Sequence, residues 1–436
     1  MKFISTRRVA PPVTFFEALL NGLAPDGGLY IPRQFVHLSE AFLKHAENNT
    51  LLQLGEAVME NFLPEVPRAD MQKIINDTLT FPIPLIELEN NLYLSEVFHG
   101  PTLAFKDVGA RFMANALAYY LKNKNMKLTI IVATSGDTGS AIAHGFHKTP
   151  NIDVYILYPS GKITALQEKQ MTTLGDNIHA LEVTGTFDDC QVLVKTALMD
   201  DEIKAKIQLT TANSINIARL LPQTIYHGWA LEQIKKINLT ADPTMVVPSG
   251  NFGNLTAALY ARGIGFPINH FVAATNANAI VPSYLQSGEF IPKPTEHTLS
   301  NAMDVGNPSN FERLNIFYDK DVRRMRHDIS GFSISDAETL TQIRQSYEKS
   351  GYILDPHTAV GVAAAKQFQL KEPSNTDPLI VTATAHPAKF PDVIKEAIGI
   401  DIPLPAALQT ALDLPKQATV ISPQFAELKK ILLASS

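Results

Sequence analysis

The sequence predicts an α/β protein with two parallel-sheet lobes and a mostly helical N-terminal domain. From residue 85 onward, strand-sized apolar runs alternate with helical patterns, as in the repeated units that build parallel sheets. The run Leu128–Ala133 is β-branched and almost continuously apolar, which is typical of a strand buried on both faces. The prolines of Phe81–Pro84 separate this alternating pattern from the helices before it.

The predicted N-terminal domain covers residues 1–90. Apolar residues at helical spacing predict helices over 15–20, 51–62 and 69–79. A turn over 24–28 leads into a short extended piece over 29–32. We find no group of residues in this domain that points to catalysis, so a structural role is expected for it.

The first α/β lobe is predicted over residues 91–212. It contains strands and helices in alternation, which requires a parallel sheet with crossover helices. We expect strands over 92–97, 128–133, 152–158 and 178–183, and helices from Phe105 and over 140–146, 166–174 and 187–199.

The second α/β lobe is predicted over residues 213–405, and a C-terminal tail over 406–436. The long helix expected over 215–234 is interrupted at Pro222, where a kink is expected. The segment 403–415 is punctuated by prolines, and the residues from 416 onward read as a closing tail. Further elements expected in this lobe are strands over 244–247, 271–275 and 379–384, helices over 255–261, 336–350 and 358–370, and a long polar loop over 298–311.

Composition limits the classes of function. The 436 residues are 45% hydrophobic and 18% charged, as in ordinary soluble globular proteins. The net charge is −6 and no basic block occurs, so we expect no nucleic-acid partner, although an anionic small substrate remains compatible. The apolar runs are strand-sized, which predicts no membrane span, and the N-terminus lacks the apolar core of a signal peptide. The single cysteine, Cys190, excludes an intrachain disulfide and favours a reducing, cytoplasmic location. We expect a monomer or a small homo-oligomer.

Lys106 is the first candidate for chemistry. Gly100 and Pro101 break the preceding strand, and a helical pattern begins near Phe105. The lysine therefore lies at a helix N-terminus, where the macrodipole disfavours a cation, and its apolar neighbours would desolvate it. A lysine with a lowered pKa can form a Schiff base. Most lysines in such a setting are exposed surface residues, so the rest of the chain must decide.

Two glycine-containing loops follow buried strands and precede helices. The loop Ser135–Gly139 offers backbone N–H groups and the hydroxyls of Ser135 and Thr138 to an anion, although such loops often only cap a helix. The loop Ser249–Asn254 has the same placement. It lacks the Gly-Lys-Ser/Thr of a triphosphate loop and the spacing of a dinucleotide fingerprint, so a compact nest for one phosphate is the better interpretation.

Two further segments carry polar groups at element ends. Asn213, Ser214 and Arg219 lie near a helix start, where a guanidinium with amide and hydroxyl donors would suit a second phosphate. A capped helix with an exposed arginine is the alternative. Thr384 ends a predicted buried strand, where open sheets bind ligands, and could bond a heterocycle nitrogen or cap the loop. His386, before a proline, is expected to be structural.

Together these parts indicate pyridoxal 5′-phosphate. A lysine for the Schiff base, a loop for the cofactor phosphate and a side chain for the ring nitrogen are what this cofactor requires. One cysteine and no His-Glu-x-x-His pattern disfavour zinc, and no Gly-x-Ser-x-Gly nucleophile elbow occurs.

Five motifs in the expected order resemble the threonine synthase family, and a sixth segment near the N-terminus, Asp26–Pro32 (DGGLYIP), resembles the corresponding region of that family. The resemblance spans nearly the whole chain. The five motifs are His99–Asp107 (HGPTLAFKD), Ser135–Ser140 (SGDTGS), Ser249–Asn254 (SGNFGN), Ser300–Gly306 (SNAMDVG) and Thr384–Phe390 (TAHPAKF).

This resemblance implies the tryptophan-synthase-β-like fold of pyridoxal enzymes (fold type II), with the cofactor between two α/β lobes. It also implies a lyase of threonine biosynthesis that converts O-phospho-L-homoserine and water to L-threonine and phosphate. Lys106 would hold the cofactor, and Thr384 would face its ring nitrogen and leave it largely unprotonated. The loop residues Gly250, Asn251, Phe252, Gly253 and Asn254 would bind the cofactor phosphate.

The same resemblance implies the substrate contacts. Ser135 and Thr138 would hold the substrate carboxylate, and Asn213, Ser214 and Arg219 its phosphate. Asp137 stands where related pyridoxal enzymes often have Asn near the ring hydroxyl, and its role stays open. Lys106, once released by the substrate, would act as general base for the α-proton; no metal is expected.

Two alternatives are weighed against this hypothesis. A serine or threonine dehydratase shares the fold and the lysine chemistry but takes a substrate without phosphate, so inhibition by a phosphonate analogue of phosphohomoserine would separate the two. A nucleotide-binding regulatory protein would contain no pyridoxal, and the purified protein would be colourless.

Overall fold

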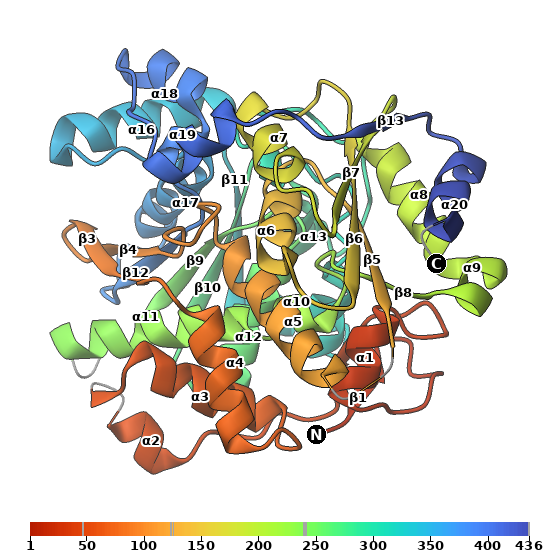
Figure 1. Cartoon of the computed structure of the whole chain (residues 1–436). Helices are drawn as coiled ribbons and strands as arrows, with labels where there is room; N and C mark the ends of the chain where they lie inside the picture. Colours follow the sequence, from red (N-terminus) through yellow and green to blue (C-terminus); the bar gives the residue numbers. More distant parts are fainter. Residues whose placement is uncertain (46–47, 123, 125, 239–241, 435–436) are drawn as a thin grey trace.

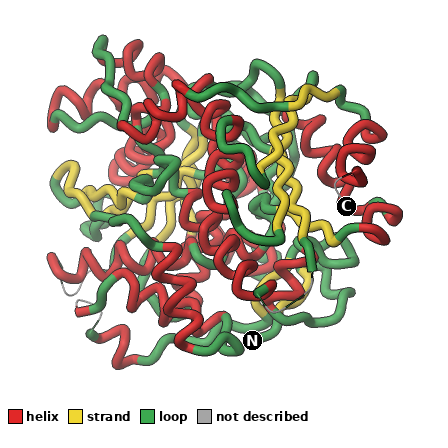
Figure 2. The backbone as a smooth tube through the Cα atoms, in the orientation of Figure 1, coloured by secondary structure: helices red, strands yellow, loops and turns green. Residues whose placement is uncertain are grey.

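Two mainly parallel sheets, of six and five strands, organise the chain, with helices between them and on their outer faces (Figures 1 and 2). The computed structural model describes residues 1–45, 48–122, 124, 126–238 and 242–434. The predicted class, two parallel-sheet α/β lobes with a helical N-terminal region, is confirmed. Among the described helices, none combines the length and the hydropathy that crossing a lipid bilayer requires.

The six-stranded sheet has the order β11-β10-β9-β12-β4-β3, and every neighbouring pair is parallel except β3 and β4 at one edge. The strand expected over 92–97 belongs to this sheet, although we predicted it in the first lobe, over 91–212. The predicted boundary between residues 90 and 91 therefore does not separate the two sheets, because β4 pairs with β12 from the far end of the chain. The strands are β3 (Leu85–Glu89), β4 (Leu92–Glu96), β9 (Thr244–Pro248), β10 (His270–Thr275), β11 (Ile329–Ser333) and β12 (Leu379–Ala383).

Each strand of this sheet sends alternate side chains into two cores. Met245 and Val247 join the large central core, whereas Val246 joins a second core on the opposite face. Helix α17 crosses that second face against β9 and β12. The helices associated with this sheet are α11 (Gln223–Ile237), α12 (Gly253–Gly263), α13 (Ile280–Ser287), α16 (Asp336–Ser350), α17 (Pro356–Lys371) and α18 (Pro391–Ile398).

The five-stranded sheet has the order β13-β7-β6-β5-β8 and is parallel throughout. Its edge strand β13 comes from the segment expected to be a closing tail. That expectation is wrong for the described part, because β13 pairs with β7 and the following helix buries Leu428 and Leu432; residues 435–436 lie outside the described residues. The strands are β5 (Leu128–Ala133), β6 (Ile152–Pro159), β7 (Ile178–Val183), β8 (Gln208–Thr211) and β13 (Thr419–Ile421).

The two faces of the five-stranded sheet also serve different cores. Ile130 and Val132 point into the central core with α5 and α6, and Ile131 and Ala133 point into a third core with α8. Helices between the sheets therefore share one core with both of them. Helix α5 (Lys106–Leu121) follows β4 of the six-stranded sheet and packs against α6 between the two sheets. The other helices of this part are α6 (Asp137–Phe146), α7 (Ala165–Thr172), α8 (Phe187–Met199), α9 (Asp201–Lys206), α19 (Ala406–Asp413) and α20 (Phe425–Ala434).

The helix expected over 215–234 is two helices, α10 (Ile217–Leu220) and α11, and not one kinked helix. Pro222 is the residue before α11 and has φ −66°. A proline lacks the N–H that a continuous helix would need at this point, which separates the two helices. The first of the two helices, α10, carries Arg219.

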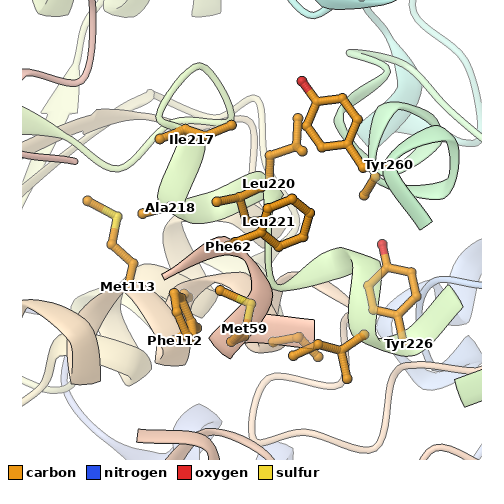
Figure 3. Packing of buried hydrophobic residues seen from close by; sticks show 14 of the residues in the cluster. Met59, Phe62, Phe112, Met113, Ile217, Ala218, Leu220, Leu221, Tyr226 and Tyr260 are labelled. Atoms are coloured by element: carbon orange, nitrogen blue, oxygen red, sulfur yellow. The ribbon is translucent and has the colours of Figure 1, made fainter. Parts of the chain in front are cut away.

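The N-terminal residues form a support for α5 and α10. Figure 3 shows Met59 and Phe62 in one buried cluster with Phe112, Met113 and Leu221. The two helices that carry Lys106 and Arg219 are thus packed against this region. Its elements are β1 (Phe3–Ser5), α1 (Phe15–Asn21), β2 (Tyr30–Pro32), α2 (Glu40–Lys44), α3 (Leu51–Phe62) and α4 (Arg68–Thr78), and β1 pairs with β2 antiparallel.

The expected polar loop over 298–311 forms part of the wall of a cavity between the two sheets. It contains a single 3₁₀ turn, η2 (Asn301–Met303), and is held by Asp304, which accepts hydrogen bonds from Thr298 and Asn276. The remaining short elements are α14 (Phe311–Phe317), α15 (Val322–Asp328) and η3 (Pro387–Lys389).

Candidate active site

All the residues predicted from the sequence to form the site line one cavity between the two sheets. Its empty volume is about 1350 Å³, including its opening to solvent. The predicted residues in its wall are Lys106, Ser135, Thr138, Asn213, Ser214, Arg219, Gly250, Asn251, Phe252, Gly253, Asn254 and Thr384. The topology brings them together because the carboxyl ends of parallel strands meet at one edge of each sheet.

Lys106 is the first residue of α5, and its backbone surroundings are fixed by the end of β12. The N–H of Phe105 donates to Thr384 O at 2.9 Å, and the N–H of His386 donates to Leu103 O at 3.1 Å. Within the described chain, the Nζ of Lys106 makes no hydrogen bond or ion pair. The pKa of Lys106 is lowered to about 8, chiefly by burial; Asp137 opposes this shift, and Lys389 and Arg219 add to it.

Arg219 is a buried cation that faces the cavity. Its side chain is buried, its Nη1 donates to Ala212 O, and its Nε has no hydrogen-bond partner among the described residues. Burial lowers its pKa to about 10. Gly109 lets α5 approach, because a Cβ there would lie 2.6 Å from Arg219 O. A buried guanidinium with an unused donor is what an anionic ligand would satisfy.

Ser214 and Asn213 differ in how many of their hydrogen-bonding groups are already used within the protein. Ser214 Oγ accepts hydrogen bonds from Asn251 and Asn310, which leaves its own hydrogen for a ligand. The amide of Asn213 exchanges two hydrogen bonds with the backbone of Ala133, at 3.2 and 2.7 Å. Asn213 therefore chiefly fixes the end of β5, and one amide hydrogen is left for a substrate.

The loop before α12 has the geometry of a phosphate nest. Asn254 holds the turn, since its side chain donates to Pro248 O and accepts from Ser249 Oγ, both at 2.7 Å. Phe252 adopts a left-handed conformation, φ 61°, immediately before the helix. The first N–H groups of a helix have no intrahelical acceptor, so Gly253 and Asn254 present theirs at the cavity wall.

The remaining predicted hydroxyls also face the cavity. Ser135 and Thr138 lie at the start of α6, across the cavity from the loop that precedes α12. Thr384 is buried at the end of β12, and its backbone N–H bonds to Thr358 Oγ1 at 3.3 Å. None of the described residues accepts or donates a hydrogen bond at the Oγ of these three side chains.

Comparison with known proteins agrees with this geometry. The pyridoxal-phosphate-dependent enzyme family matches residues 74–384, the threonine synthase N terminus matches residues 2–79 and the threonine synthase C-terminal region matches residues 358–432. The threonine synthase of Haemophilus influenzae is 42% identical over the full length of both chains.

The chain belongs to the threonine synthase family.

Solved structures of threonine synthases have the same fold. The pyridoxal-phosphate-bound threonine synthase of Brucella melitensis superimposes with a TM-score of 0.93 at 36% identity, covering 100% of this chain and 99% of the other. The Escherichia coli threonine synthase superimposes with a TM-score of 0.91 at 36% identity over all of both chains. The predicted family, fold and cofactor are confirmed.

The cavity residues fit the pyridoxal phosphate that the family uses. Lys106 lines the cavity with its amine unpaired among the described residues, and the nest before α12 offers backbone donors. Gly250 presses this loop against η2, because a Cβ on it would lie 2.6 Å from Met303 Cα. A threonine synthase built this way has an amine for the aldehyde group and a cradle for the phosphate group on the same sheet.

Gly250→Ala is expected to weaken cofactor binding about five- to a hundredfold, since its methyl group must displace the Met303 backbone and such overpacking costs about 1–3 kcal/mol. Gly253→Ala is the matched control, because a Cβ there meets its nearest atom, Asn310 Nδ2, at an ordinary 3.5 Å. Titration of the apoprotein with pyridoxal phosphate, followed by visible absorbance, measures both. Equal affinities for the two variants would contradict the steric argument.

Several residues of this threonine synthase site were not predicted. Lys389 forms a buried ion pair with Asp137, and His357 accepts from Ala302 N while it bonds Asp355 through Nδ1. Lys389 lies inside the Thr384–Phe390 motif, but a lysine in a sequence gives no sign of being buried. The cavity-facing side of α8 was also missed, because its residues recur as in any amphipathic helix: Phe187, Gln191, Val194, Lys195 and Leu198.

Proposed function

We propose that this chain converts O-phospho-L-homoserine and water to L-threonine and inorganic phosphate. The observation that supports this most strongly is the pairing, in one cavity, of an unpaired amine at Lys106 with a buried, unsatisfied guanidinium at Arg219. The amine of Lys106 is suited to form a Schiff base with the aldehyde of the cofactor, and the guanidinium of Arg219 is suited to bind the phosphate of the substrate. Full-length identity to threonine synthases supports the same reaction.

We propose distinct roles for the two walls of the cavity. On the six-stranded sheet, Lys106, Thr384 and the loop Gly250–Asn254 hold the cofactor, with the N–H groups of the loop on its phosphate and Thr384 Oγ1 at its ring nitrogen. On the five-stranded sheet, Ser135 and Thr138 donate to the substrate carboxylate. Arg219, Ser214 and the remaining amide hydrogen of Asn213 donate to the substrate phosphate.

Bound pyridoxal phosphate supplies the electron sink for carbanion chemistry. The chain supplies the proton transfers and the charge compensation. Lys106 Nζ, with its pKa lowered to about 8, accepts the proton from the substrate α-carbon. Arg219 stabilises the negative charge of the departing phosphate.

An assay of phosphate release and threonine formation from O-phospho-L-homoserine tests this function. We expect the two products in equal amounts, and inhibition by a phosphonate analogue of the substrate. A serine or threonine dehydratase would instead form a 2-oxo acid from the unphosphorylated amino acid and would not be inhibited by the analogue. That result would overturn the proposal.

The expectations about partners and location stay predictions. We propose a monomer or small homo-oligomer, in the cytoplasm, with no nucleic-acid or membrane partner. Light scattering coupled to size-exclusion chromatography measures the oligomeric state, and fractionation of the source cells measures the location.

A further inference from the structure

A buried ion pair lies beside the reactive amine and is not used by the proposed reaction. Asp137 Oδ1 and Lys389 Nζ are 2.6 Å apart, and the two side chains are 4% and 0% exposed. Lys389 Nζ also donates to Thr102 O at 2.9 Å, and Gln167 Nε2 donates to the same Asp137 oxygen at 3.0 Å. Both charged groups therefore have defined partners and a fixed geometry.

The charges around this pair determine what it can do. Asp137, on α6, attracts the ammonium form of Lys106, whereas Lys389, on η3, and Arg219, on α10, repel it. Asp107, on α5, accepts from Thr102 N and Oγ1 and from there faces Lys389, Arg111 and Arg219.

His357, on α17, is a further titratable side chain that acts on Asp137. Burial alone would raise the pKa of Asp137, but Lys389 and then Lys106 hold it well below its ordinary value, so this carboxylate is ionised.

A buried carboxylate needs a cation. Lys389 is paired with Asp137, and Lys106, which lines the same cavity as Asp137, interacts electrostatically with it without forming an ion pair among the described residues. If Lys106 were that cation, its ammonium would be held in an ion pair and could neither attack a carbonyl nor accept a proton. We propose that Lys389 is a positioning residue that occupies the Asp137 carboxylate and so keeps Lys106 available as a free amine. This inference rests on the proposed function only in taking Lys106 as the reactive group.

The proposal is tested on the apoprotein, without cofactor or turnover. The pKa of Lys106 is measured from the pH dependence of its acetylation by trace acetic anhydride, with the labelled peptide quantified by mass spectrometry. Lys389→Gln removes the charge but keeps donors for Asp137 and Thr102. We expect it to raise the pKa of Lys106 by at least about one pH unit, because the freed carboxylate then pairs with Lys106.

Lys389→Arg keeps the charge and is the matched control, with an unchanged Lys106 pKa. The double variant Asp137→Asn with Lys389→Gln removes the carboxylate as well, and its Lys106 pKa is expected at or below that of the unsubstituted protein. An unchanged Lys106 pKa in Lys389→Gln would overturn the proposal. If Lys389→Gln does not fold, the double variant is used to test the proposal. A raised Lys106 pKa in the folded double variant would contradict the mechanism, whereas an unchanged or lower Lys106 pKa would support it.

A second readout follows the loaded enzyme. In Lys389→Gln, the acidic limb of the kcat profile for phosphohomoserine is expected to move to higher pH, because kcat reports the enzyme–substrate complex in which Lys106 has been released as an amine. The profile of the Lys389→Arg control is expected to stay in place. A chain that forms no threonine at all would refute the proposed function, yet the acetylation experiment on the apoprotein would still decide the role of Lys389.

Discussion

Lys106→Ala is expected to abolish threonine formation, with activity reduced by at least about 10⁴-fold, and to remove the visible absorbance of the bound cofactor. Alanine has no amine to bond the aldehyde of pyridoxal phosphate or to take the α-proton. Among the described residues, the one other lysine in the cavity wall is Lys195, on α8. Absorbance spectra of the purified variant and the coupled phosphate assay measure the two losses separately.

Lys122→Ala is the control, because this exposed lysine follows the C-terminal end of the same helix, far from its first residue. It should keep both the absorbance and the activity. Full activity in Lys106→Ala would remove Lys106 from the reaction. Retained absorbance without activity would indicate that another amine holds the cofactor.

Arg219→Ala is expected to raise KM for O-phospho-L-homoserine about ten- to a hundredfold, with a smaller change in kcat. Hydrogen bonds to a charged group contribute about 1.5–3 kcal/mol, and the guanidinium of Arg219 lines the cavity with only Nη1 hydrogen-bonded among the described residues. Competitive inhibition by inorganic phosphate should weaken by the same factor. Steady-state kinetics with phosphate as inhibitor measures both.

Arg111→Ala separates phosphate binding from packing. Arg111 is on α5 like Lys106, but it donates to the backbone oxygens of Thr78 and Asp77 and does not line the cavity. Its loss should lower the melting temperature and leave KM unchanged. An unchanged KM in Arg219→Ala would take Arg219 out of the phosphate site.

Local pattern was sufficient to predict most of the fold. The run Leu128–Ala133 is β5 to the residue, and 51–62 and 187–199 are helices with the expected bounds, because apolar spacing and caps act within one element. Short edge elements were missed, such as β8 and β13. Their few residues become strands through pairing with β5 and β7, and no local signal records a partner so distant in the chain.

The site shows a similar division. Motifs identified the residues whose chemical groups face the cavity, from Lys106 to Thr384. They did not reveal that the amide of Asn213 is largely used by Ala133, or that Lys389 is buried against Asp137. Both facts depend on which strands and helices meet, so they required the three-dimensional arrangement.

The attachment of the Lys106 turn to the end of β12 has a mechanical consequence. Because Phe105 N bonds Thr384 O, the amine, the strand-end threonine and the loop before α12 all move with the six-stranded sheet. Ser135 and Thr138 move with the five-stranded sheet, since they follow β5. A rotation of one sheet against the other would leave these contacts intact, but it would have to break the Asp137–Lys389 ion pair that joins α6 to η3.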